Sequence, residues 1–312
     1  MQQRRLGKNG PLVSVVGLGC NNFGGRIDLA ASRKVVHKAL DAGITLLDTA
    51  DIYGTDSGSE KALGEILGAR RKDIVLATKF GMPLQMGGKV DASRGYIAKA
   101  IDASLKRLKT DWIDLYQLHK PDPATPLEET LRGLDDLVRQ GKVRYIGCSN
   151  LPARDVAEAS RIAKQHGLTA FISCQDEYSL VVRDIERDLL PVIEANGMGL
   201  LPFFPLASGL LTGKYKRNEP KPPGTRLAKM QNHADRYLTP ENWTKVEKLT
   251  EFAEARGHTL LELAFGWFLS RPVLASVIAG ATKPEQVEGN VRAAGWTLTP
   301  DEVKQIDATS AG

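Results

Sequence analysis

The chain has 312 residues, of which 42% are hydrophobic and 25% are charged, and its formal net charge is +5. This composition argues against a disordered chain, and the length suits either one α/β barrel or two smaller domains. The basic residues are scattered rather than gathered in a stripe with aromatic residues, which argues against a nucleic-acid-binding protein.

The sequence also lacks the patterns of membrane, secreted and metal-binding proteins. Its longest apolar stretches, such as residues 199–206, are far shorter than a membrane span, and residues 1–10 have no apolar signal region. Cys20, Cys148 and Cys174 lie far apart, with no histidine at metal-ligand spacing. We therefore expect a cytoplasmic protein with reduced cysteines, no metal ion, and neither nucleic acid nor membrane as a partner.

Short apolar segments alternate with amphipathic segments along the whole chain. The predicted strands are Val13–Gly19, Ile44–Asp48, Ile74–Lys79, Ile113–His119, Val143–Ser149, Phe171–Gln175, Gly199–Phe204 and Ser276–Gly280. A Thr-Pro-x-Glu pattern at Thr125–Glu128 and at Thr299–Glu302 predicts two helix starts, each with a capping box. Pro202 removes a ladder donor from the seventh strand, which is therefore expected to begin or bend there.

Eight strand-and-helix units with no linker between them predict a single (β/α)₈ TIM barrel over residues 1–312, rather than a doubly wound sheet with a second domain. The basic, proline-rich residues 212–229 are too irregular for a helix. We therefore expect a long loop over about residues 207–240, which is typical of a functional segment.

Polar residues end several of the predicted strands, where a barrel of this kind carries its active site. In chain order they are Asp48, Lys79, His119, Ser149, Asn150 and Gln175. One such residue alone is usually the start of a solvated loop. Three ionisable types on three adjacent strands indicate a site.

Tyr53 follows Asp48 by five residues and belongs to the same predicted site. Neighbouring parallel strands lie about 4.8 Å apart, so Asp48 can contact Lys79 while the turn carries Tyr53 back to the lysine. A lysine cation favours the phenolate, and we expect it to lower the pKa of Tyr53 while Asp48 keeps Lys79 charged. The alternative is a structural Asp–Lys pair beside a surface tyrosine; His119 at the same rim favours a proton-transfer site.

Five segments resemble signatures of the aldo-keto reductase family in the same order, and the resemblance spans nearly the whole chain. They are GITLLDTADIYG, LATKFG, DWIDLYQLHKPD, GKVRYIGCSN and PLASGLLTGKY. The resemblance implies an oxidoreductase that reduces an aldehyde or ketone to an alcohol, or the reverse, with NADPH or NADH. Its implied catalytic residues are Asp48, Tyr53, Lys79 and His119, with Tyr53 as general acid and His119 orienting the substrate. Asp51 does not match the spacing.

The resemblance also implies a cofactor extended across the barrel mouth. The implied cofactor-binding residues are Gly19, Asn21, Ser149, Asn150, Gln175, Phe203, Pro205, Leu206, Ser208, Leu210, Lys214, Gly280, Thr282, Lys283, Gln286 and Asn290. Ser149, Asn150 and Gln175 would bind the carboxamide, and Phe203 would stack on the nicotinamide. The family commonly has Tyr-Ser-Pro-Leu where this chain has Phe-Phe-Pro-Leu, so Phe204 lacks the serine hydroxyl.

A phosphate site is expected after the last strand. Thr282 and Glu285 have capping-box spacing, which predicts a helix whose N-terminus, with Lys283, attracts an anion. This favours NADPH over NADH. The segment GLGCNNFGG at residues 17–25 lacks the third glycine of a dinucleotide fingerprint and is interpreted as a strand-to-loop turn.

The substrate pocket is expected to involve Phe23, Tyr53, Trp112 and His119, with a small carbonyl or alcohol as substrate. Trp112 could equally be core packing before its strand. Two other functions stay open: a channel-binding subunit of similar fold, which the lack of a long N-terminal extension disfavours, and a Schiff-base aldolase using Lys79. A charged Lys79 would oppose the aldolase. The oligomeric state and the physiological substrate are not predicted.

Overall fold

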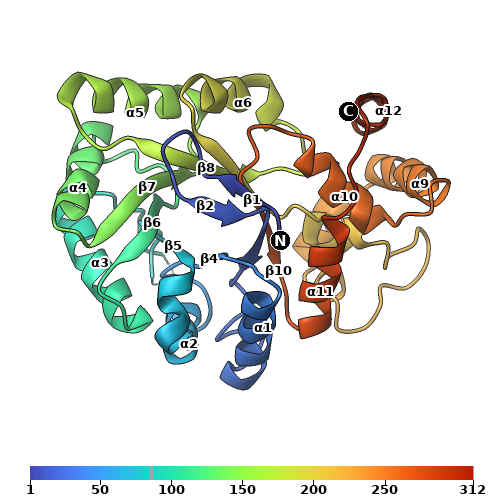
Figure 1. Ribbon diagram of the computed structural model, residues 1–312, viewed down its shortest axis with the longest axis horizontal. Helices are drawn as coiled ribbons and strands as arrows, with labels where there is room; N and C mark the ends of the chain where they lie inside the picture. Colours follow the sequence, from blue (N-terminus) through green and yellow to red (C-terminus); the bar gives the residue numbers. More distant parts are fainter. Residues whose placement is uncertain (85–86, 312) are drawn as a thin grey trace.

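The computed structural model describes residues 1–84 and 87–311 and shows the predicted barrel (Figure 1). Eight parallel strands form one sheet in the order β10-β3-β4-β5-β6-β7-β8-β9, and helices surround it. The strands are β3 (Val16–Gly19), β4 (Leu46–Asp48), β5 (Val75–Phe80), β6 (Ile113–Leu118), β7 (Val143–Ser149), β8 (Phe171–Glu177), β9 (Gly199–Phe203) and β10 (Val277–Gly280).

The outer layer consists of helices that alternate with the strands. They are α1 (Leu29–Asp41), α2 (Gly58–Leu67), α3 (Arg94–Leu108), α4 (Leu127–Arg139), α5 (Ala153–His166), α6 (Ile185–Ala195), α9 (Pro240–Glu254), α10 (Leu260–Leu269), α11 (Pro284–Ala293) and α12 (Pro300–Ser310), with a 3₁₀ turn η1 (Gly68–Asp73) after α2. No helix in residues 1–84 and 87–311 combines the length and apolarity needed to cross a membrane.

The segment expected as a long loop contains short helical pieces. They are η2 (Ala207–Thr212), α7 (Arg226–Lys229) and α8 (Gln231–Tyr237). The irregular sequence thus forms helical pieces of one or two turns instead of a fully irregular loop. Leu227 and Tyr237 are buried, and they pin these turns to the barrel.

An N-terminal hairpin closes the end of the barrel where the strands begin (Figure 1). The single strand predicted at Val13–Gly19 is wrong: β2 (Leu12–Ser14) pairs antiparallel with β1 (Gln3–Arg5), and β3 begins only at Val16. The chain changes partner at Val15, whose N–H donates to the carbonyl of Gln2 at 3.0 Å. Leu6 and Val13 from this hairpin are fully buried and cap the interior of the barrel.

Inside the barrel the side chains form an apolar layer and then a polar one. Side chains of a strand alternate between its two faces, so residues two apart share the interior. On β5, Val75 and Ala77 belong to the apolar interior cluster, and Lys79 follows on the same face. The interior therefore becomes polar only at the C-terminal ends of the strands, where the candidate site lies.

The sheet has a seam between β9 and β10, and Pro202 lies beside it. The Leu200 N–H donates across the seam to the Val273 carbonyl at 2.9 Å, and Ala275 donates back to Leu200 at 3.0 Å. Pro202 lies two residues after Leu200, so its backbone nitrogen, which carries no hydrogen, faces the seam and not β8. Pro202 therefore sits inside β9, paired in register with Asp176 of β8, at no cost to the β8–β9 ladder.

The two predicted capping boxes have different outcomes. Thr299 caps α12 with the full reciprocal box to Glu302, as predicted. Thr125 does not cap α4, which has Pro126 at the cap position and no side-chain bond there. Thr125 lies one residue before the cap position, so its oxygen is out of register with the first N–H groups of α4, and its hydroxyl donates to Asp122 at 2.6 Å.

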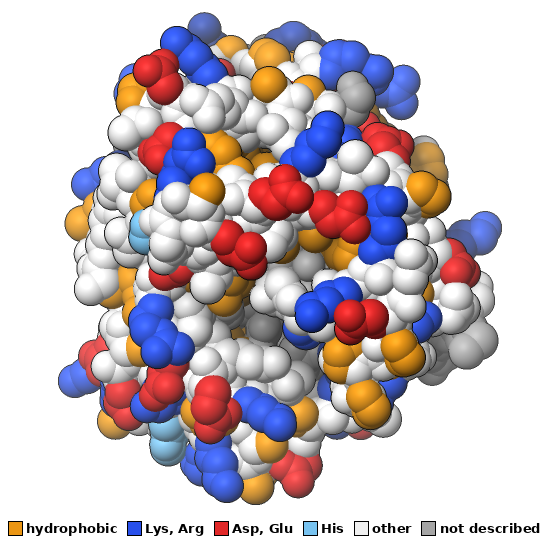
Figure 2. Space-filling model, turned by 90° about the vertical axis from the view of Figure 1, so that its right-hand side faces the viewer, with side chains coloured by type: hydrophobic (Ala, Val, Ile, Leu, Met, Phe, Trp, Pro, Cys, Tyr) orange, Lys and Arg blue, Asp and Glu red, His pale blue; other side chains and the backbone are white. Residues whose placement is uncertain are grey.

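Basic and acidic side chains are interspersed on the face shown in Figure 2, which is the right-hand side of Figure 1. No large area of one sign covers this face. The view agrees with the scattered charges of the sequence.

Candidate active site

Lys79 lies at the centre of a hydrogen-bonded group at the C-terminal rim of the barrel. Its Nζ donates to Asp48 Oδ2 at 2.6 Å, to the Thr49 carbonyl at 3.0 Å and to the Tyr53 hydroxyl at 3.3 Å. The side chain of Lys79 is fully buried, and that of Asp48 is 4% exposed. The structure thus brings together the three residues that the sequence placed in one site.

Both carboxylate oxygens of Asp48 accept hydrogen bonds from side chains. Besides Lys79, the side-chain amides of Gln117 and Gln175 donate to Oδ1 at 3.1 Å and 2.9 Å. Gln117 was not expected in the site, although it precedes His119 by two residues on β6 and therefore shares the interior face. Gln175 uses its amide nitrogen on Asp48, which fixes the orientation of that side chain at the rim.

Burial and charge set the pKa values of Lys79 and Tyr53. Burial alone would lower the pKa of Lys79, but Asp48 and Tyr53 outweigh it and raise this pKa. Burial raises the pKa of Tyr53, and Lys79 offsets only part of the rise. The expectation of a lowered Tyr53 pKa is therefore wrong, because the desolvation of the phenolate is a larger effect than the charge of Lys79.

His119 faces Tyr53 edge to face, with ring centroids 5.7 Å apart and an interplanar angle of 81°. Burial, and then the charges of Lys79 and Lys120, lower the pKa of His119 to about 3. The imidazole is therefore neutral at physiological pH. Its Nδ1 is buried without a partner among the described residues, so the ring keeps unused hydrogen-bonding capacity.

Ser59, at the start of α2, joins the loops that carry these groups. Its buried hydroxyl donates to the Cys20 carbonyl and shares a hydrogen bond with the Thr49 hydroxyl, both at 2.8 Å. Its backbone N–H donates to the Tyr53 carbonyl at 3.0 Å. Gly54 completes the turn at φ +75°, where a Cβ would collide with the carbonyl of Phe23.

Asp51 lies in the same turn, and its backbone N–H donates to the Lys79 carbonyl at 3.2 Å, but its carboxylate makes no hydrogen bond to the Lys79 ammonium. Burial, and then the charge of Glu60, raise its pKa to about 7. One of its carboxyl oxygens has no partner among the described residues. The structure therefore agrees with the choice of Asp48 as the partner of Lys79.

A cleft of about 860 Å³ opens above the rim, with Asp48, Tyr53 and His119 in its wall. Of the sixteen residues expected to bind a cofactor, fifteen line this cleft. The exception is Leu210, whose side chain is fully buried in the core behind it. The cleft thus brings together residues from loops after β3, β7, β8, β9 and β10.

Of the four residues expected in the substrate pocket, Tyr53 and His119 line the cleft, whereas Phe23 and Trp112 lie elsewhere. Phe23 is fully buried in the core between the sheet and the helices. Trp112 precedes β6 and therefore lies at the opposite end of the barrel, where Arg71 and Arg144 each stack on its ring at 4.7 Å. Both arginines pair with Asp114, so Trp112 belongs to a structural cluster.

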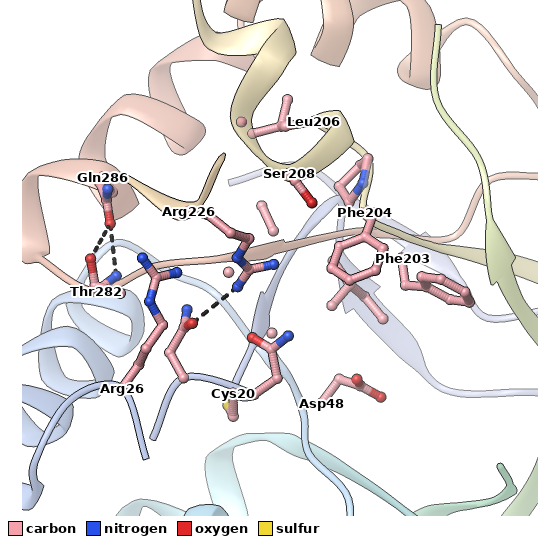
Figure 3. Close-up of a pocket in the computed structure, with 18 of the residues that line it drawn as sticks. Cys20, Arg26, Asp48, Phe203, Phe204, Leu206, Ser208, Arg226, Thr282 and Gln286 are labelled. Atoms are coloured by element: carbon pink, nitrogen blue, oxygen red, sulfur yellow. Dashed lines mark hydrogen bonds between the residues drawn. The ribbon is translucent and has the colours of Figure 1, made fainter. Parts of the chain in front are cut away.

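Three basic side chains, those of Arg26, Lys214 and Arg226, gather in the cleft, and none of them forms an ion pair with a carboxylate among the described residues. Figure 3 shows Arg26 and Arg226 side by side, between Thr282 and Phe204. Burial lowers the pKa of Lys214, and the charges of Arg226 and Arg26 lower it further. Arg26 and Arg226 were not expected from the sequence, because they come from distant loops; the basic composition of residues 212–229 was the only signal.

Arg226 also ties its loop to the first strand–helix connection. Its guanidinium donates to Asn22 Oδ1 at 3.0 Å, and the Asn22 amide donates to the Ala281 carbonyl at 3.3 Å. The guanidinium also lies 5.5 Å from the ring of Phe204, the residue that stands where a serine is common. This position therefore carries an aromatic surface in place of a hydroxyl.

The start of α11 is organised differently from the expected capping box. Lys283 is the cap residue and makes no side-chain cap bond. The Thr282 N–H and hydroxyl both donate to Gln286 Oε1, at 2.7 Å and 3.1 Å (Figure 3). Glu285 is not the partner, because the helix begins one residue later, at Pro284, which places Gln286 in reach of Thr282.

Comparison with known proteins supplies further information. The model of the aldo/keto reductase family matches residues 15–311. The chain is 36% identical to a probable voltage-gated potassium channel subunit beta of Oryza sativa subsp. japonica, covering 99% of this chain and 96% of the relative. It is 37% identical to a putative subunit of the same type from Schizosaccharomyces pombe, covering 97% and 92%. It is 34% identical to L-glyceraldehyde 3-phosphate reductase of Escherichia coli (strain K12), covering 98% and 92%.

Proposed function

The chain belongs to the aldo/keto reductase family of carbonyl-reducing oxidoreductases, and we propose that it reduces an aldehyde or ketone with NADPH, using Tyr53 as the proton donor. The observation that carries this proposal is the contact of the Lys79 ammonium with both Asp48 and the Tyr53 hydroxyl in the wall of a large cleft. The reaction is reversible in principle, so the same groups would serve alcohol oxidation.

Each residue of the group has a distinct task in this proposal. Tyr53 holds its proton because its pKa is raised, and it gives that proton to the carbonyl oxygen. The Lys79 ammonium stabilises the phenolate that Tyr53 leaves behind, and Asp48 keeps the ammonium charged and in place. Neutral His119 can donate a hydrogen bond to the carbonyl oxygen and so orient the substrate.

The residues of the cleft fit a cofactor that carries phosphate groups. Arg26, Lys214 and Arg226 repel one another, and a polyanion between them would relieve this repulsion. Lys283 at the start of α11 adds a fourth cation beside a helix N-terminus. A reduced nicotinamide, when bound, would supply the hydride, and Ser149, Asn150 and Gln175, which line the cleft at the rim, would orient its ring.

The proposal is tested by assaying a panel of aldehydes, ketones and aldoses with NADPH and with NADH, following the absorbance of the reduced nicotinamide. We expect turnover with NADPH. The replacement Lys283→Ala should raise the Kd of NADPH by about 10-fold, the lower end for a charge-assisted contact at an exposed residue. The Kd of NADH should change little. An absence of turnover with every carbonyl and both cofactors would overturn the proposal.

Two other functions were considered for the same chain. A Schiff-base aldolase would need a neutral Lys79, whereas Asp48 and Tyr53 raise the pKa of this amine. The similarity to proteins named as potassium channel β subunits favours a second role in binding a membrane protein, which is compatible with catalysis. Rapid steady-state turnover of a carbonyl would favour the enzyme, whereas single-turnover oxidation of bound cofactor would favour the binding subunit.

A further inference from the structure

The cations of the cleft divide into two groups according to the strands that carry them. Arg26 follows β3, Lys214, Arg226 and Arg236 follow β9, and Lys283 follows β10. These three strands are neighbours around the barrel. Lys120 follows β6. Two strands, β4 and β5, lie between β6 and β3, and two others, β7 and β8, lie between β6 and β9. Lys120 therefore lies across the cleft from the cluster proposed to bind the phosphates of the cofactor.

Lys120 has no carboxylate partner in the cleft. Among the described residues that line the cleft, the acidic side chains are Asp48 and Glu177. Asp48 is paired with Lys79 at 2.6 Å, and Glu177 with Arg236 at 2.6 Å. Lys120 is exposed to solvent at the mouth, so its charge is available to an incoming molecule.

The backbone that carries Lys120 is fixed beside the reacting groups. The His119 N–H donates to the Phe80 carbonyl, and the Asn150 side chain donates to the His119 carbonyl, both at 3.0 Å. On the other side, Asp122 accepts from the Ala92 N–H at 2.9 Å, which anchors the following turn to the loop after β5. The ammonium is thus on a flexible stem attached to a fixed point next to His119.

We infer that the substrate of this site carries an anionic group, a phosphate or a carboxylate, a few bonds from its carbonyl, and that Lys120 binds this group. This inference rests on the proposed carbonyl reduction. With the carbonyl held between Tyr53 and His119, the anionic end lies on the β6 side of the cleft. A lysine acts as a mobile point charge, so it selects the charge of the substrate more than its shape.

The test compares two pairs of substrates that differ in charge. Glyceraldehyde 3-phosphate is paired with glyceraldehyde, and succinic semialdehyde with butanal. The wild type should show a higher kcat/KM for the anionic member of at least one pair. Lys120→Met, which keeps the stem and removes the charge, should lower the ratio of anionic to neutral kcat/KM by about 10-fold. Lys120→Arg should retain the ratio, and added salt should reduce it in the wild type.

Lys164→Met provides the matched control, because Lys164 is an exposed lysine on α5 outside the cleft.

A fall in the ratio confined to the phosphate pair would assign a phosphate, and a fall in both pairs would assign anions in general. An unchanged ratio in Lys120→Met would overturn the inference while leaving carbonyl reduction intact. A matching rise in the Kd of NADPH would also overturn it, because Lys120 would then belong to the cofactor site. Failure of all four carbonyls with the wild type and with every variant would instead overturn the proposed carbonyl reduction.

Discussion

The rim of the barrel and the basic cluster of Arg26, Lys214 and Arg226 line the same cleft but are built in opposite ways. At the rim, Lys79 and Asp48 are buried, paired and held by strands whose neighbours fix their register. In the basic cluster, the side chains come from loops and repel one another. This difference is what the proposed function requires: a rim organised in advance for the chemical step, and a cluster whose mutual repulsion an anionic cofactor would relieve.

The largest effect is expected at the rim and concerns turnover. Tyr53→Phe removes the proposed proton donor and should lower kcat by about 100-fold or more, the usual scale for a positioned acid. The Kd of NADPH, measured by quenching of protein fluorescence, should stay close to the wild-type value. Tyr96→Phe is the matched control, because Tyr96 lies on α3 outside the cleft. Near-normal turnover in Tyr53→Phe would remove the rim from the chemistry.

In the basic cluster we expect a substitution to weaken cofactor binding much more than turnover. Arg226→Met should raise the Kd of NADPH by roughly 10- to 100-fold, because one charge-assisted contact is lost. At saturating cofactor, kcat should fall far less. Arg154→Met, at an exposed arginine of α5, serves as the control. A large loss of kcat with an unchanged Kd would show that the two regions do not divide the work in this way.

A smaller effect on turnover is expected for Ser59, whose hydroxyl bonds the loops that carry the rim residues. Ser59→Ala leaves the Cys20 carbonyl and the Thr49 hydroxyl without their buried partner, which should lower the free energy of unfolding by about 1–3 kcal/mol. We expect kcat to fall by roughly 5-fold, because the Lys79 ammonium is bonded to the carbonyl of Thr49. Ser160→Ala removes only a hydroxyl bonded within α5 and should change neither quantity appreciably. Unchanged kcat in Ser59→Ala would show that the strands alone position the rim.

The smallest effect concerns the protonation of His119. Its pKa of about 3 predicts that its imidazole resonances do not titrate between pH 8 and pH 5 in the folded protein. In urea they should titrate near the ordinary value of about 6.5. Between these two pKa values His119 is protonated in the unfolded chain but not in the folded chain. This residue therefore lowers the free energy of unfolding as the pH falls from about 6.5 towards 3. Titration of the folded-state signal near pH 6.5 would contradict the buried, neutral ring.

The sequence predicted the rim well because its placement follows from strand alternation. Asp48, Lys79 and His119 end strands that lie side by side, so their common position follows once the barrel is recognised. Gln117 could have been found from the same alternation. The pKa of Tyr53 could not, because it depends on how far burial outweighs the charge of Lys79.

The loops were predicted less well because their positions depend on tertiary contacts. Arg226 reaches the cleft only through its contact with Asn22, far away in the chain. Phe23 is buried in the core, and the following Gly24 has φ +63°, a backbone conformation that the residue pattern alone did not indicate. Trp112 was assigned to the pocket for its aromatic ring, although a residue that precedes a strand lies at the end of the barrel opposite the site.

The seam between β9 and β10 also has a consequence for how the chain folds. Val16 of β3 pairs with Val277 of β10, so almost the whole chain must be ordered before the ring can close. Such non-local pairing is slow, and until it forms the edge of β9 is open to pairing with other molecules. Pro202 withholds one donor at that edge, which should make the incompletely closed barrel a poorer template for aggregation. We therefore expect Pro202→Val to increase light scattering during refolding.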